Sequence, residues 1–208
     1  MYIKYIRKNP STPIMISVPH AGQIYPNEFL LFKKLSLNNL KVMEDFQCQK
    51  ILDKVNKDVA DMIIAKCSRS VVDLNRSRNA IDEDMFDDKI LMVPAEETLM
   101  LSSGLGVIPK KCYEDFIFHS KLPKLYATNL LENVYDPYHK TIKNNLKKLQ
   151  FLFGFSMLID LHSMPSKVTN KKSADIVVGD NFGKSCSSEI KNYIFNFFKS
   201  KSLNVTLN

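Results

Sequence analysis

The sequence predicts an α/β protein in which helices cover both faces of a β-sheet. Short apolar runs, typical of buried strands, alternate with segments whose apolar residues recur at three- and four-residue steps, as in amphipathic helices. The chain of 208 residues is 45% hydrophobic and 25% charged, which is ordinary globular composition. At this length we expect a single domain over residues 1–208.

Five apolar runs are expected to be strands because each is short and most are bounded by turn-forming residues. They cover residues 14–18, 70–74, 156–161, 175–178 and 203–207. Between them, apolar periodicity predicts a helix over 45–64, with a strand following near 62–65, and further helices over 137–151 and 187–199. Residues 30–40 and 113–133 are expected to be helical only in part, the latter interrupted at Pro123.

Polar side chains follow several of the predicted strands. His20 comes after the first strand, the pair Asn75 and Arg76 after the second, and His162 with Ser163 after the third. In open α/β sheets ligands bind at the carboxyl ends of the strands. We therefore expect these residues to share one site.

The two strand-end histidines suit a metal ion. A hydrolytic zinc site has three protein ligands and one open position, so His20 and His162 need a carboxylate beside them. Glu44 and Asp45 are the candidates, although acidic residues also stabilise the first turn of a helix without binding metal. Asp160 points to the same face of its strand as His162 and either orients that ligand or forms hydrogen bonds at the sheet edge.

Arginine is scarce in this chain, which makes each one informative. Only four of the 29 basic residues are Arg, and Arg69, Arg76 and Arg78 lie within ten residues. An Asn beside an Arg, as at Asn75 and Arg76, can grip a carboxylate with a bidentate fork and a further amide donor. The alternative is a salt-bridge cluster at the surface. A metal beside such a clamp suits an amide substrate that carries a free carboxylate.

Charge and composition exclude other classes. The net charge of +7 comes mostly from dispersed Lys, whereas nucleic-acid recognition favours clustered Arg, so we expect no nucleic-acid partner. The longest uncharged apolar run, residues 151–159, is too short to span a bilayer, and no signal peptide is apparent. We expect a cytoplasmic protein with no membrane partner, whose four Cys residues are reduced thiols.

Several motifs occur together in the order seen in N-formylglutamate amidohydrolases, and the chain resembles that family from about residue 14 to its end. The motifs lie at residues 17–22 (SVPHAG), 25–26 (YP), 72–76 (VDLNR), 104–108 (GLGVI), 137–139 (PYH), 160–165 (DLHSMP) and 174–179 (ADIVVG). The resemblance implies a three-layer α/β/α fold with a central mixed sheet, like that of zinc carboxypeptidases and aspartoacylases. It also implies hydrolysis of the N-formyl or N-acyl amide of an amino acid.

The resemblance assigns roles by motif position. His20, Asp45 and His162 match the metal ligands for one zinc ion per chain, with Glu44 as the fallback for Asp45. Asn75 and Arg76 match residues that hold the α-carboxylate of the substrate. Arg69 resembles the arginine that polarises the scissile carbonyl. Asp160 and Ser163 are expected to contact the metal ligands and orient them without binding the metal themselves.

The family pattern also implies a further segment after residues 205–208 (VTLN), ending in a strand that carries a catalytic glutamate. The sequence ends at Asn208. The expected fold therefore lacks its C-terminal strand, and we expect zinc binding with weak or absent turnover.

Three interpretations of the function remain open: an amidohydrolase, a homologue that only binds metal or an acidic small molecule, and a basic nucleic-acid-binding domain. The acyl group, the amino acid and the oligomeric state are open too. Lys110 and Arg78 are candidate partners for a second substrate carboxylate, and manganese, cobalt or iron could replace zinc.

Overall fold

A computed structural model describes residues 1–45, 47–88, 99–164 and 174–207. The chain forms two compact units, residues 1–163 and 164–208, which are described separately. The elements of the first unit are β1 (Tyr2–Tyr5), β2 (Ile14–Val18), α1 (Asn27–Phe32), α2 (Leu37–Leu40), η1 (Lys41–Met43), α3 (Cys48–Leu52), β3 (Asp61–Ala65), η2 (Glu83–Met85), α4 (Leu99–Ser102), β4 (Lys111–Cys112), β5 (Asp115–Phe116), α5 (Lys124–Leu130), η3 (Leu131–Tyr135), α6 (Asp136–Phe153) and β6 (Met157–Asp160).

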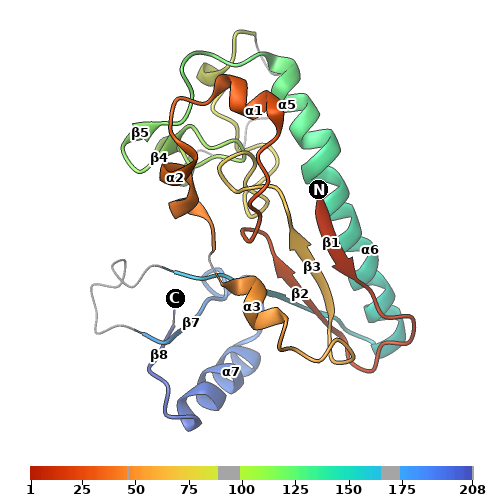
Figure 1. Ribbon diagram of the computed structural model, residues 1–208. Helices are drawn as coiled ribbons and strands as arrows, with labels where there is room; N and C mark the ends of the chain where they lie inside the picture. The colour runs from red at the N-terminus through yellow and green to blue at the C-terminus, as the bar shows by residue number, and fades with distance from the viewer. Residues whose placement is uncertain (46, 89–98, 165–173, 208) are drawn as a thin grey trace. The chain divides into compact units, whose positions relative to one another are not determined.

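The first unit is built on a mixed sheet with the strand order β1-β3-β2-β6 (Figure 1). Strand β1 is antiparallel to β3, whereas β2 is parallel to both β3 and β6. The parallel strands β2, β3 and β6 therefore end at the same edge of the sheet, where the loops after β2 and β6 begin. The predicted α/β class with a mixed central sheet is confirmed.

Helices pack on both faces of this sheet. The buried side chains Tyr138, Ile142 and Leu149 of α6 join a cluster that includes Met15 of β2 and Ile63 of β3. Their spacings of four and seven residues, about one and two helical turns, put them on one helix face. On the opposite face of the sheet, Val18, Met62 and Ile64 pack with Cys48 and Leu52 of α3.

The second unit contains β7 (Ile176–Val178), α7 (Ser188–Ser200) and β8 (Val205–Leu207). Strands β7 and β8 are parallel and pair with each other, and α7 connects them as a crossover helix. The predicted strands at 175–178 and 203–207 and the predicted helix at 187–199 correspond to these elements.

Two sequence predictions in the first unit are wrong. Residues 70–74 form a turn rather than a strand, because Val71 and Val72 both donate their backbone N–H to the carbonyl of Ser68. The long helix over 45–64 is reduced to α3, Cys48–Leu52. Beyond it the side chain of Asn56 accepts the backbone N–H of Asp58, a local turn that competes with the helix.

Among the described residues, no helix combines the length and apolarity needed to cross a membrane.

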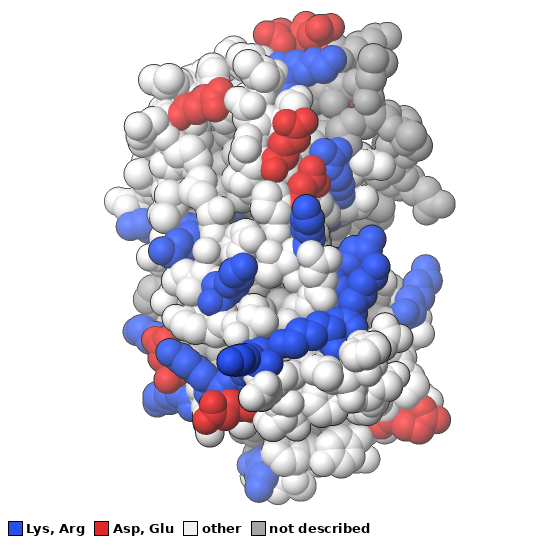
Figure 2. All heavy atoms as spheres, turned by 90° about the vertical axis from the view of Figure 1, so that its right-hand side faces the viewer, with Lys and Arg blue, Asp and Glu red and all other residues white. Residues whose placement is uncertain are grey.

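Basic side chains spread over much of the face shown in Figure 2, with acidic side chains among them. Lys140, Lys143 and Lys147 are exposed positions on α6. Dispersed Lys on a helix surface is what the composition predicts for a solvated face.

Candidate metal centre

The structure brings His20, Asp45 and His162 together, although the sequence separates them widely. One potential ligand atom from each lies within 4.8 Å of the others. His162 Nδ1 is 2.8 Å and His20 Nδ1 is 3.5 Å from the same Asp45 oxygen, Oδ2. His20 and Asp45 are buried, whereas the His162 side chain is 32% exposed. The cluster therefore has a closed base and one accessible side.

Each of the three residues is placed by local structure. His20 follows β2, and His162 follows β6, the parallel neighbour of β2. The backbone N–H of Asp45 donates to the carbonyl of His20 at 2.9 Å, so the segments that carry these two side chains are joined directly. The loop after His20 turns back onto residues 66–68, where Gly22 approaches so closely that a Cβ would lie 2.0 Å from the carbonyl oxygen of Cys67. Only glycine fits this approach.

The donor set fits a metal ion. His20 Nε2 lies 2.7 Å from Asp73 Oδ1 and donates its hydrogen to that carboxylate. The other nitrogen, Nδ1, then carries a lone pair, faces Asp45 and makes no hydrogen bond with any described residue. A buried imidazole nitrogen of this kind, held by a carboxylate behind it, is the arrangement found in histidines that bind metals. Two imidazole nitrogens and one carboxylate oxygen suit zinc.

The electrostatics of the cluster follow from these contacts. Burial alone would raise the pKa of Asp45, but the hydrogen bond from His162 and the proximity of both imidazoles lower it to about 2. Burial would lower the pKa of His20, yet Asp45 and Asp73 on its two sides raise it. The site therefore favours positive charge between its carboxylates, which is what a bound cation supplies.

Asp73, to which the sequence patterns assigned no role, is bonded directly to the cluster. Its side chain is 1% exposed and accepts hydrogen bonds from His20 Nε2, from Arg69 Nε at 2.9 Å and from the backbone N–H of Asn75 at 2.8 Å. Burial would raise the pKa of Asp73, but the hydrogen bond from His20 and the charges of Arg69 and Arg76 lower it. Asp73 lies two residues before Asn75, but that spacing gives no indication of its bond to His20, which is 53 positions away.

The predicted substrate-binding residues lie beside the cluster. Asn75 Nδ2 is 3.2 Å from His162 Nε2, so this side chain is at the exposed rim of the site. Arg76 Nε donates to the carbonyl of Leu105 at 3.2 Å and lies 3.8 Å from Asp73 Oδ2. Arg69 and Arg76 therefore approach the same buried carboxylate, and both side chains are about one-fifth exposed, at 22% and 21%.

The remaining candidates lie elsewhere. Glu44 is hydrogen-bonded by the hydroxyls of Tyr25 and Ser68, and burial together with Glu44 raises the pKa of Tyr25 to about 12. The engagement of Glu44 by these two hydroxyls favours Asp45 over Glu44 as the third ligand.

Ser163 lies beside the Cys48 thiol. Asp160 makes no hydrogen bond or ion pair with the three cluster residues within the described ranges, and its supporting role stays a prediction.

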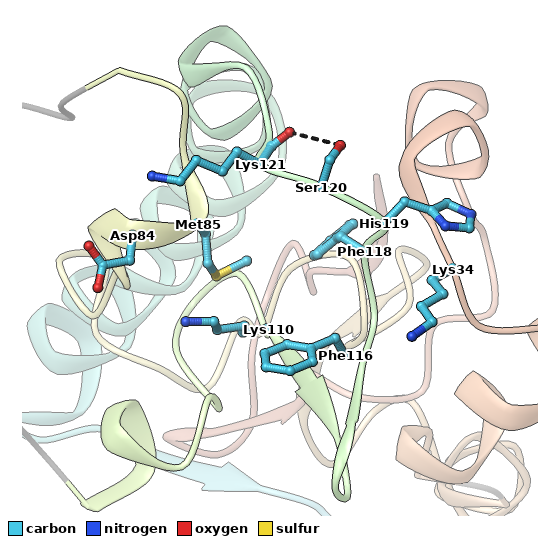
Figure 3. A pocket seen from close by; sticks show the side chains of 9 residues that line it. All are labelled: Lys34, Asp84, Met85, Lys110, Phe116, Phe118, His119, Ser120 and Lys121. Atoms are coloured by element: carbon cyan, nitrogen blue, oxygen red, sulfur yellow. Dashed lines mark hydrogen bonds between the residues drawn. The ribbon is translucent and has the colours of Figure 1, made fainter.

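Arg78 and Lys110 are both paired with acidic residues. Arg78 binds Asp136 through Nε at 2.7 Å and Nη2 at 3.0 Å, and Lys110 binds Asp82 at 2.7 Å. Lys110 also borders a separate hollow of about 370 Å³ (Figure 3). Its lining consists of Lys34, Asp84, Met85, Lys110, Phe116, Phe118, His119, Ser120 and Lys121. It shares no residue with the metal cluster, and Asp82 and Asp84 offset much of its positive charge.

The fold and the cluster together define an α/β protein with a candidate mononuclear metal centre. A family model described as N-formylglutamate amidohydrolase matches residues 12–208. The chain therefore belongs to the N-formylglutamate amidohydrolase family.

Similar proteins agree with this assignment. An N-formylglutamate deformylase of Pseudomonas aeruginosa is 29% identical over 195 residues, covering 86% of this chain and 63% of the relative. One from Pseudomonas putida is 28% identical over 183 residues, covering 84% of this chain and 61% of the relative. The chain thus spans less than two-thirds of the length of these curated relatives.

Two solved structures support the fold. The N-formylglutamate amidohydrolase of Ralstonia eutropha JMP134 has a TM-score of 0.90 at 21% identity, covering 100% of this chain and 76% of that one. A gene product of Agrobacterium tumefaciens has a TM-score of 0.65 at 16% identity, covering 96% of this chain and 69% of that one.

Proposed function

We propose that this chain hydrolyses the formyl amide of N-formylglutamate, or of a similar N-acyl amino acid, with one zinc ion held by His20, Asp45 and His162. The observation that carries the proposal is the buried His20 Nδ1, which has no hydrogen-bond partner among the described residues and faces Asp45 beside His162. The names of the Pseudomonas relatives support the substrate. A zinc ion at this position would act as a Lewis acid that activates water for attack on the formyl carbon.

Asp73 holds His20 in the tautomer that this role requires, and the Asn75 amide can do the same for His162. Asp73 accepts the hydrogen of His20 Nε2 and so leaves Nδ1 available to a metal. If His162 binds through Nδ1, which faces Asp45, its Nε2 carries the hydrogen. The structure places Asn75 Nδ2 against His162 Nε2; exchanging the positions of the amide oxygen and nitrogen would let the oxygen accept from Nε2 and leave the nitrogen to donate to substrate.

The arginines supply positive charge where the substrate is negative. Arg76 and the amide nitrogen of Asn75 hold the α-carboxylate, which fixes the formyl group relative to the cluster. Arg69 uses Nε to bind Asp73, and its terminal nitrogens remain to stabilise the negative charge that develops on the formyl oxygen. The buried Asp73 carboxylate holds Arg69 in place for this task and lies close to Arg76.

The first test measures zinc content and formate release in the same preparations. We expect about one zinc ion per chain in the wild type, with release of formate from N-formyl-L-glutamate. His162→Ala should lose both. His119→Ala is the matched control, because His119 lines the separate hollow rather than the cluster.

Three results would change the proposal. A well-folded wild type without zinc would contradict the metal site. Zinc binding without formate release would support a chain that binds metal and an acidic small molecule without turning it over. Loss of zinc in His119→Ala as well as His162→Ala would show that the cluster is not the site that holds the metal.

A further inference from the structure

A π-helical turn lies between α5 and α6, next to the loop that contains Asn75 and Arg76. The helical segment runs without a break from Lys124 to Phe153, and its middle turn, η3, is wider than an α-helical turn. Such turns interrupt the regular spacing of side chains and are frequent at functional sites. Directly after it, the rings of Tyr135 and His139 lie against each other with centroids 4.2 Å apart.

These two side chains hold the backbone on both sides of Asn75. Tyr135 Oη donates to the carbonyl of Arg76 at 2.7 Å. His139 Nε2 donates to the carbonyl of Leu74 at 3.0 Å. Because the two carbonyls flank Asn75, fixing them restricts the backbone angles that aim the Asn75 side chain.

The loop needs such support because it has no strand or helix of its own. The carbonyls of Leu74 and Arg76 are not used in backbone hydrogen bonds within the described part of the chain. The two ring side chains therefore supply the bonds that regular structure would otherwise provide. The bidentate pair between Arg78 and Asp136 ties the chain to the same helix two residues beyond Arg76.

The tautomer of His139 follows from its partner. A carbonyl oxygen only accepts, so Nε2 must carry hydrogen. Neutral imidazole is sufficient for this bond. A glutamine at position 139 carries an amide nitrogen at a similar distance from the backbone and can replace the donor, whereas a leucine cannot.

We propose that Tyr135 and His139 are positioning residues that hold the loop at Leu74–Arg76 so that Asn75 and Arg76 can bind a substrate carboxylate. The inference rests on the proposed function for the identity of the ligand. It adds two residues, one on α6 and one on the π-turn before it, that make no hydrogen bond or ion pair with His20, Asp45 or His162 within the described part of the chain. Their effect passes through two backbone carbonyls.

The test compares Tyr135→Phe, His139→Leu and His139→Gln with Thr141→Val, all in the zinc-loaded chain. Thr141 is the control because it lies on the same helix but bonds Tyr2 and the carbonyl of Pro137 instead of the loop. The probe is L-glutamate, which carries the α-carboxylate and undergoes no turnover. Hydrogen exchange of the peptide that contains residues 73–77 reports on the loop itself, with or without ligand.

Tyr135→Phe and His139→Leu should each raise the Kd for L-glutamate roughly three- to tenfold, the effect of one lost hydrogen bond. Both should also speed exchange in the loop, with zinc content unchanged. His139→Gln should restore affinity and slow exchange to nearly the wild-type level. Thr141→Val should match the wild type in both measurements, whatever its effect on stability.

Unchanged loop exchange in both variants would overturn the inference. Faster exchange with unchanged L-glutamate affinity would also overturn it, because the contacts would then be structural only. If the wild type binds neither zinc nor L-glutamate, the proposed function fails, and the exchange measurements alone still decide whether Tyr135 and His139 hold the loop.

Discussion

The Asp73 carboxylate connects the proposed metal ligand His20 to the arginines that are proposed to bind substrate. It bonds His20 on one side and Arg69 on the other, and Arg76 lies 3.8 Å away. A single buried charge therefore sets the tautomer of His20 and holds Arg69, one of the two arginines proposed to face the substrate. Removing a residue that hydrogen-bonds a metal ligand typically lowers metal affinity or activity about 10- to 100-fold.

Replacing Asp73 with Ala should weaken zinc binding about 10- to 100-fold, because His20 loses the acceptor that fixes its tautomer. Competition with a chelating dye measures the affinity. Asp160→Ala provides the comparison, since Asp160 lies near His162 in sequence but makes no bond to the cluster within the described residues. Equal losses in the two variants would assign the supporting role to Asp160 as well, and no loss in Asp73→Ala would contradict the tautomer argument.

The metal-site residues proposed from the sequence lie close together because ligand-bearing loops follow β2 and β6, which are parallel neighbours. That inference needs only the order of strands and polar residues along the chain. Asp73 was not predicted because its bond to His20 joins residues 53 positions apart. Nothing in local spacing indicates that a carboxylate two residues before Asn75 turns toward a histidine in a distant loop.

At the scale of elements, a buried ion pair joins β3 to the segments around it. Asp61, at the start of β3, is fully buried and bonds Arg7 Nε at 2.7 Å and Asn145 Nδ2 of α6 at 2.7 Å. Arg7 in turn donates to the carbonyls of Thr12 and Asp58. The network fixes the ends of β1, β2 and β3 against the helix.

Asp61→Asn should lower the free energy of unfolding by about 3 kcal/mol, because it leaves the Arg7 charge buried without its partner. Burial would raise the pKa of Asp61, but Arg7 and Asn145 lower it below the value in the unfolded chain. This stabilisation is therefore complete above about pH 4 and is lost as the pH falls through the folded pKa. Urea unfolding at several pH values measures both effects. A variant with the same acid dependence as the wild type would contradict the assignment.

Local pattern predicted some elements better than others. The run at 14–18 corresponds to β2 and the helix from 137 to α6, since each has a clear period and clear boundaries. Residues 70–74 are as apolar as a strand, but their apolarity reflects burial in the core rather than extended backbone. The strand β1 was not predicted because its four residues include Lys4, and only its pairing with β3 makes it a strand.

At the scale of the whole molecule, the sequence predicted an α/β fold with a mixed sheet and the family to which the chain belongs. It did not predict the strand order β1-β3-β2-β6. Order depends on which distant strands pair, and a strand's own residues are compatible with several neighbours. The position of β1 at one end of the sheet therefore could not be predicted from the local sequence pattern.

The pairing of β2 with β6 has a consequence for folding kinetics. Asp45 and His162 are 117 positions apart, so the cluster forms only after a long loop has closed. If the cluster holds zinc as proposed, we expect the ion to bind after the rate-limiting step and not to nucleate folding. Refolding followed by stopped-flow fluorescence should proceed at the same rate with and without zinc, while zinc slows unfolding. Faster refolding with zinc would mean that the ligands meet early, before the sheet is complete.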